Sequence, residues 1–193
     1  MNPLNSILGT IITGIVISLV IVFVLSTGAG NLNEWTIWFH AVVGVIWIGL
    51  LYYFNFVQVP GMAKAKADGT AAGISKHIAP TALLWFRWAA VLTWLSGAAA
   101  LYKYGILHDA FMLKPHAAVI GVGAWLGTIM LFNVWVLIWP NQKKVLGIVA
   151  ADDAAKAKAG KIALMASRTN TALSIPMLLC MTASTFHNGG LPF

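Results

Sequence analysis

The chain has 193 residues, of which 60% are hydrophobic and only 9% are charged, and its mean hydropathy is +0.83. This composition excludes a soluble globular protein, because so few polar side chains cannot cover its surface, and it indicates an integral membrane protein. The formal charge of +7 does not imply a nucleic-acid partner, because the basic residues are dispersed in loops between apolar segments, as membrane topology requires.

The apolar segments predict the architecture. A bilayer has a hydrocarbon core about 30 Å thick, which about 20 helical residues cross. Five segments are long enough, and they are residues 5–27, 35–58, 80–103, 115–139 and 162–186. We therefore expect an all-α fold, a polytopic bundle of five transmembrane helices that forms one domain over residues 1–193. No Lys or Arg precedes the first segment, and it is longer than the apolar region of a signal peptide, so we interpret it as a retained helix.

The lysines predict the orientation of this bundle. They gather in the loops around residues 59–79 and 140–161, whereas the opposite side has only Lys103 and Lys114. By the positive-inside rule, the N-terminus and both lysine-rich loops are cytoplasmic and the C-terminus is periplasmic, in a bacterial inner membrane. Cys180 is the only cysteine and cannot form an intrachain disulfide.

The second and third segments share a plan with the fourth and fifth. In each pair the first segment contains a histidine and a Phe-Asn dipeptide and ends at a proline, and the second has an arginine in its first half. The residues are His40, Asn55, Pro60 and Arg87 in the first pair and His116, Asn133, Pro140 and Arg168 in the second. This pattern predicts an internal two-helix repeat with a site between the halves.

The histidines are the first candidate site. His40 and His116 lie at matching places of the repeat, at the predicted outer end, and His187 ends the fifth segment there. A helical step of 100° per residue puts Gly44 and Trp47 on the side of His40, and Gly123 and Gly127 on the side of His116. Plain helix packing also accounts for the glycines, but an ionisable residue inside a membrane marks a functional site.

Two imidazoles on facing helices can hold both axial positions of a heme iron. The sequence contains no Cys-x-x-Cys-His motif, so the heme would be bound non-covalently as heme b. We predict iron ligation by His40 and His116, with His187 as the reserve ligand. Copper held by the same histidines is the weaker alternative.

A second polar group lies toward the predicted cytoplasmic side. It comprises Arg87 and Arg168 and the amides Asn55, Asn133 and Asn170. The five segments contain no Asp or Glu, so we expect the arginines to bind heme propionates or an anionic substrate, with the asparagines beside it. Extension of the arginines to lipid phosphates is the alternative.

Three segments, residues 38–58, 84–88 and 167–177, resemble the membrane region of bacterial membrane-bound urate hydroxylases. The resemblance implies urate oxidation, with electrons passed to a cytochrome c domain that follows a longer membrane region. This chain has fewer spans and lacks that domain, so a separate cytochrome c or a larger membrane complex is the expected acceptor. The stretch from His40 to Gly49 is also similar to short heme-binding protoporphyrinogen oxidases and, more distantly, to copper-resistance membrane proteins.

The sequence therefore predicts a membrane b-type heme redox protein that transfers electrons toward a periplasmic cytochrome c-type acceptor. Two alternatives stay open: a non-catalytic accessory subunit of a larger membrane respiratory or oxygenase complex, and a copper-handling membrane protein. The sequence also leaves open whether the chain is itself an oxidoreductase of the urate hydroxylase kind, and whether it forms a homo-oligomer.

Overall fold

A computed structural model describes residues 2–25 and 32–186. These described residues form helices and turns and contain no strand, which confirms the predicted all-α fold. The chain divides into two units, Met1–Trp35 and Thr36–Phe193. Membrane proteins are helical for a physical reason, since a helix satisfies every backbone polar group internally where no water is present.

The smaller unit contains a 3-10 turn, η1 (Pro3–Asn5), and helix α1 (Ile7–Leu25). Asn2 caps the turn by accepting a hydrogen bond from the Leu4 amide at 2.9 Å. Helix α1 has 19 residues, none of them charged and none of them buried, and its length and composition suit a membrane crossing. This matches the interpretation of the first segment as a membrane helix.

Four described helical stretches are long and apolar enough to cross a membrane. They are Ile7–Leu25, Leu32–Ala67, Ala71–Lys103 and Pro115–Val145. The fifth predicted segment lies inside α9 (Asp153–Phe186), which has 34 residues but is more polar, because Ser167–Thr171 includes an arginine and an asparagine. Length and composition therefore support four of the five predicted spans directly.

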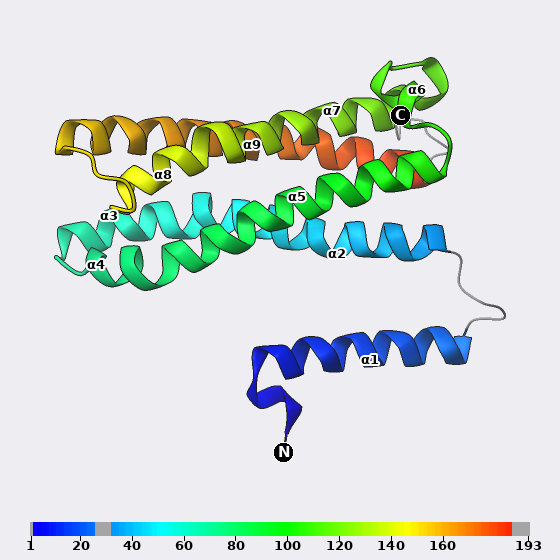
Figure 1. Ribbon diagram of the computed structural model, residues 1–193, viewed down its shortest axis with the longest axis horizontal. Coiled ribbons are helices and arrows are strands. Elements are labelled where there is room, and N and C mark those ends of the chain that lie inside the picture. Colours follow the sequence, from blue (N-terminus) through cyan, green and yellow to red (C-terminus); the bar gives the residue numbers. More distant parts are fainter. Residues whose placement is uncertain (1, 26–31, 187–193) are drawn as a thin grey trace. The chain divides into compact units, whose positions relative to one another are not determined.

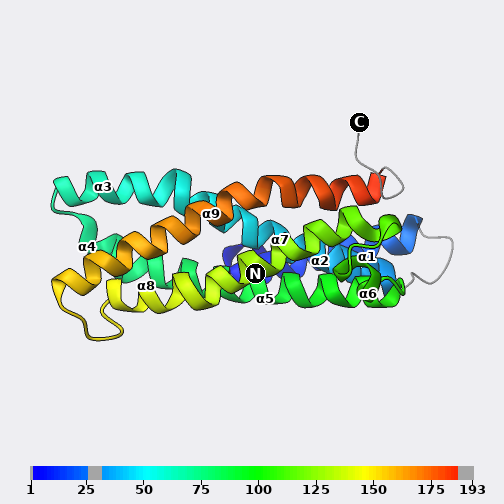
Figure 2. The same cartoon turned by 90° about the horizontal axis from the view of Figure 1, so that it is seen from above.

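The larger unit is built from two long helical hairpins. The first consists of α2 (Leu32–Tyr52), η2 (Tyr53–Gln58) and α3 (Val59–Ala67), followed by α4 (Ala71–Gly73), η3 (Ile74–Ile78) and α5 (Ala79–Lys103). After α6 (Leu107–Phe111), the second consists of η4 (Pro115–Ala117), α7 (Ala118–Phe132), η5 (Asn133–Ile138) and α8 (Trp139–Val145), followed by α9. Figures 1 and 2 show α3, α8 and the start of α9 at one end and α6 at the other, so the lysine-rich segments share an end.

The sequence predicted that two helices end at Pro60 and Pro140, and this prediction is wrong. Helical structure continues past Pro60 to Ala67 and past Pro140 to Val145. The residue before each proline makes a wide π-type hydrogen bond, from the Val59 N–H to the Phe54 carbonyl and from the Trp139 N–H to the Val134 carbonyl. A proline clashes with the carbonyl of residue i−4 in an α-helix, and the wider π turn opens the backbone where this ring must fit.

Glycines close the two hairpin turns at the lysine-rich end. Gly69 and Gly147 have φ values of 71° and 75°, a left-handed conformation that costs glycine little. The next residue in each turn then bonds back to the helix, from the Thr70 N–H to the Ala65 carbonyl at 2.8 Å and from the Ile148 N–H to the Lys143 carbonyl at 2.9 Å. This is the ordinary glycine-based end of a helix, and both halves of the predicted repeat use it.

The core of the larger unit lies where the hairpins meet. Its most buried large side chains are Trp47, Leu51, Phe86, Met130 and Val134, from α2, α5, α7 and η5. The rings of Phe54 and Phe86 meet edge to face with centroids 5.4 Å apart, an arrangement that aromatic pairs favour. The core therefore joins elements from both halves of the predicted repeat.

Among the glycines of this unit, Gly121 makes the closest backbone contact, with the carbonyl of Ala110 in α6. An added Cβ would overlap this carbonyl and would lie 2.9 Å from Leu113 Cδ2. We expect Gly121→Ala to lower the free energy of unfolding by about 2 kcal/mol, because an overpacked backbone contact cannot relax by rotating a side chain. Thermal unfolding in detergent measures the change.

The matched control is Gly127→Ala on the same helix, because a Cβ there has no atom within 4 Å. We expect its melting temperature to equal or exceed that of the wild type, since alanine favours a helix more than glycine does. Equal melting temperatures for the two variants would contradict the role given to the contact between Gly121 and Ala110.

Candidate functional site

His40 projects from α2 toward α5 and is held by the backbone of that helix. Its Nδ1 lies 2.9 Å from the Thr93 carbonyl oxygen and 3.3 Å from Ser96 Oγ. A carbonyl only accepts, so Nδ1 carries the proton and donates it, and the lone pair of a neutral ring is on Nε2. A hydrogen bond of this kind from one ring nitrogen to a carbonyl fixes the tautomer and the orientation of the ring.

Gly97 makes room for this ring. A Cβ at Gly97 would lie 2.9 Å from His40 Cε1 and 3.2 Å from Nδ1, closer than side-chain atoms approach one another. Trp47, seven residues after His40 on α2, is 2% exposed, and its indole Nε1 is buried without a hydrogen-bond partner among the described residues. Unpaired buried donors are rare, so the His40 side of α2 carries two groups that could serve a ligand.

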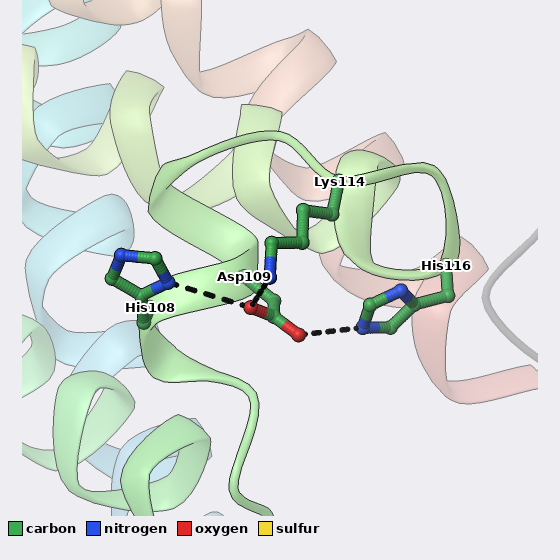
Figure 3. Close-up of polar contacts among 4 residues, drawn as sticks. All are labelled: His108, Asp109, Lys114 and His116. Carbon is green, nitrogen blue, oxygen red and sulfur yellow. Dashed lines mark hydrogen bonds and ion pairs between the residues drawn. The ribbon is translucent and has the colours of Figure 1, made fainter.

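His116 lies in a different environment, at the α6 end of the unit (Figure 3). Its Nε2 is 3.1 Å from Asp109 Oδ2, and its side chain is 58% exposed. The same carboxylate contacts Lys114 Nζ at 2.7 Å and His108 Nδ1 at 3.4 Å. The two predicted ligands therefore differ, because His40 has an unused Nε2 inside the bundle and the Nε2 of His116 is already on Asp109.

His108, Asp109, Lys114 and His116 form a cluster with Asp109 as its anionic centre. We call it the outer cluster, after the end of the bundle that the sequence predicts to face outward. Lys114 lowers the pKa of the Asp109 carboxyl below the ordinary value, chiefly by the hydrogen bond from its ammonium, and partial burial opposes this while His108 adds to it. A depressed pKa means that the ionised carboxylate stabilises the fold above the unfolded value of about 3.9. The stabilisation is lost as the pH falls through the lower folded pKa.

We expect Asp109→Asn to lower the melting temperature slightly at pH 7 and by less at pH 3, because the stabilisation by the carboxylate declines once the pH is below the unfolded value of about 3.9. The effect is small because the cluster is exposed to solvent. Melting curves at both pH values test this. Asp153→Asn is the control, since its carboxylate is 104% exposed and 3.9 Å from Lys156, and it should change neither curve.

The small residues predicted beside the histidines mostly pack against other helices. A Cβ at Gly123 would lie 3.1 Å from Cys180 Cβ and 3.2 Å from Met181 Cε, and one at Gly44 would lie 3.7 Å from Thr93 Cγ2. These positions are therefore close helix contacts, the alternative that the sequence left open. His187 lies outside the described residues.

The three predicted asparagines hold α9 against its neighbours. Asn170 Nδ2 donates to the Met130 carbonyl at 2.9 Å, and its Oδ1 accepts from Asn133 Nδ2 at 2.8 Å. Asn55 Nδ2 donates to Ser167 Oγ at 2.8 Å, while Asn55 Oδ1 is buried without a partner among the described residues. The amides of Asn133 and Asn170 are thus satisfied within the protein.

The two arginines do not share an environment. The Arg87 guanidinium carbon lies 3.6 Å from the ring centroid of Trp139, a cation–π distance, and its Nε is buried without a hydrogen-bond partner among the described residues. Arg168 is exposed on α9. The sequence predicted an anion for Arg87 and missed Trp139, which supplies part of its stabilisation.

One polar link was not predicted from the sequence. The Tyr52 and Ser174 hydroxyls are 2.9 Å apart, and Ser174 donates to the Thr171 carbonyl at 2.7 Å. Ser174 is fully buried, so this pair ties α2 to α9. The described residues contain no group of three His, Cys, Asp or Glu side chains placed to hold a bare metal ion.

Comparison with known proteins gave one match, which covers the second hairpin. Neither the curated proteins nor the solved structures gave a match. Residues 106–189 match the family model described as urate oxidase N-terminal. The match includes α7, η5, α8 and the described part of α9, with His116, Asn133, Arg168 and Asn170. Residues 106–189 are therefore similar to the urate oxidase N-terminal family, the family that the sequence resembles.

Proposed function

We propose that this chain is a membrane redox module related to the urate hydroxylases, which binds a b-type heme through His40 and passes electrons toward a separate c-type acceptor. The observation that carries the proposal is the state of His40, whose Nδ1 is fixed by the Thr93 carbonyl at 2.9 Å while Nε2 keeps its lone pair. The family match of residues 106–189 supports the redox class.

The residues around His40 suit a heme ligand in their chemistry. A hydrogen bond from Nδ1–H to a carbonyl fixes the tautomer and makes Nε2 a better iron ligand. The unpaired Nε1–H of Trp47, on the same side of α2, is a donor for a carboxylate such as a propionate. A heme held here would supply reversible one-electron transfer.

His116 is the second predicted ligand, but its contacts must change before it can coordinate iron through Nε2. Its Nε2 already contacts Asp109, so either this contact breaks or Nδ1 becomes the coordinating atom. His40 can ligate iron without breaking any contact. We therefore assign the heme to His40 and treat the pairing with His116 as a separate hypothesis.

The proposed orientation places the outer cluster on the acceptor side. The lysine-rich segments gather at the opposite end (Figure 1), which the positive-inside rule makes cytoplasmic in a bacterial inner membrane. His40 lies in the first turns of α2, near the end at which α6 lies. Electrons would leave from this end to a partner protein in the periplasm.

A pyridine hemochrome assay on the purified full chain tests the proposal. We expect the spectrum of heme b, and a Soret band with resolved α and β bands after dithionite reduction. A protein that remains colourless after expression with added heme precursor overturns the heme assignment. Copper without iron by metal analysis would favour the copper-handling alternative.

Electron transfer is tested on the reduced protein by adding oxidised cytochrome c and following both absorption spectra. Reoxidation of the chain together with reduction of cytochrome c is the expected result. A red protein that exchanges no electrons and copurifies stoichiometrically with a larger complex would instead support the accessory-subunit alternative.

A further inference from the structure

An open hollow of about 380 Å³ lies between the end of α2 and the start of α5. Leu50 and Tyr53 line one side, and His77, Ile78, Thr81 and Trp85 line the other together with Ala82. Its volume is at the lower end of those that hold small organic ligands. Figure 1 shows α2 and α5 of this hairpin side by side, and the lining residues belong to the end of α2, to η2 and η3 and to the start of α5.

The polar groups of this hollow have no partners within the described protein. The Tyr53 hydroxyl, the His77 ring and the Thr81 hydroxyl make no hydrogen bond with any described residue. The surrounding surface is apolar, since Trp85 is 52% and Ile78 47% exposed, and in a membrane such side chains face lipid. His77 and Thr81 are exposed and Tyr53 is half-buried, so their polar groups are accessible to a ligand that lies in the hollow and brings its own polar atoms.

We propose that this hollow binds the head group of a lipid-soluble quinone. Two carbonyls on opposite sides of a flat ring would accept hydrogen bonds from Tyr53 and His77, which lie on opposite sides of the hollow. The indole of Trp85 and the side chain of Leu50 would contact the ring faces, and the isoprenoid tail would leave into lipid. Imidazole and hydroxyl groups both donate and accept, so the reduced quinol would bind there as well.

A second hollow differs from the first in the chemistry of the side chains that line it. It measures about 470 Å³ and lies in the second hairpin, between η5 and α9. Lys161, Ile162, Met165, Ala166 and Thr169 line it with the same spacing as His77, Ile78, Thr81, Ala82 and Trp85. Its lining contains a lysine and no histidine, no aromatic side chain, and an asparagine whose amide already bonds to Asn170. Lys161 and Thr169 give the second hollow donors as well, but of these two hollows only the first combines a phenol and an imidazole with an aromatic wall.

This inference deepens the proposed function by naming the class of its electron donor, but its test needs no heme. The full chain is reconstituted in nanodiscs of quinone-free phosphatidylcholine, and a short-tailed benzoquinone is added by titration. Quenching of tryptophan fluorescence gives Kd. Loss of one hydrogen bond costs about 1 kcal/mol, so we expect Tyr53→Phe and His77→Leu each to raise Kd about fivefold and the double variant to raise it more than tenfold.

Met165→Ala and Thr169→Ala are the controls, because they alter the lining of the second hollow and leave that of the first unchanged. Both should bind with the wild-type Kd. A wild-type Kd in the double variant overturns the proposal, as does an equal loss in the controls or a complete failure of the wild type to bind. Native mass spectrometry supplies a further arm, since a phospholipid that stays on the wild type, leaves on His77→Leu and is not displaced by the quinone would show a lipid site instead.

Discussion

His40→Ala is expected to remove more than nine-tenths of the bound heme b, measured as the ratio of pyridine hemochrome to protein. The ring nitrogen that the proposal uses, Nε2, is the one that the hydrogen bond from Nδ1 to the Thr93 carbonyl leaves with a lone pair. Alanine removes both nitrogens. No other described histidine is held this way inside the bundle, so the described residues offer no equivalent replacement there.

His116→Ala is the matched comparison and should keep most of the heme. Its side chain is 58% exposed and bonded to Asp109, so its loss alters the outer cluster rather than the inside of the bundle. Similar losses in the two variants, with both proteins monodisperse and helical, would contradict single ligation by His40. That result would support the bis-histidine pair predicted from the sequence and would require the contact with Asp109 to break.

Gly97→Ala tests whether the position of the His40 ring matters for heme binding, because this variant keeps the ring but displaces it. The added methyl would lie 2.9 Å from His40 Cε1, so it must move the imidazole while leaving both nitrogens in the protein. We expect retained folding, weaker heme binding and a shifted Soret band. An unchanged spectrum would show that the ring position between α2 and α5 does not matter for the cofactor.

The sequence predicted the helical bundle well because bilayer thickness constrains it so strongly. Apolar length alone located α1, α2, α5 and α7 to within several residues, and the lysine pattern correctly placed two distant turns at the same end. The errors lie at Pro60 and Pro140, where a proline was taken as a helix end. A π turn accommodates such a ring, and no sequence periodicity distinguishes that outcome from a helix end.

The candidate site was harder to predict because equivalent positions in a repeat need not have equivalent neighbours. His40 meets a backbone carbonyl of α5, whereas His116 meets Asp109, which lies in α6 between the two halves and has no counterpart in the first. The asparagines were identified as important polar residues, but their partners depend on how α9 packs. Those contacts are long-range, so composition and spacing could not assign them.

Asn170→Leu is expected to lower the free energy of unfolding by about 2 to 3 kcal/mol, because it leaves a buried amide without its acceptor. Asn170 is fully buried and joins α9 to η5 and α7 through Asn133 and the Met130 carbonyl, at 2.8 and 2.9 Å. Among the described residues, Asn133 Nδ2 donates only to Asn170 Oδ1. Unfolding by SDS titration in mixed micelles measures the difference.

The control and the double variant decide whether the interhelical bond is responsible. Asn141→Leu removes an amide that bonds only to the Leu137 carbonyl of its own helix, at 2.7 Å, and it should cost less than half as much. Asn133→Leu combined with Asn170→Leu removes both partners, so no buried donor is left unpaired, and the double variant should be more stable than the sum of the two single effects predicts. Strict additivity would mean that the two amides act independently, and α9 would then be held in place mainly by its apolar contacts.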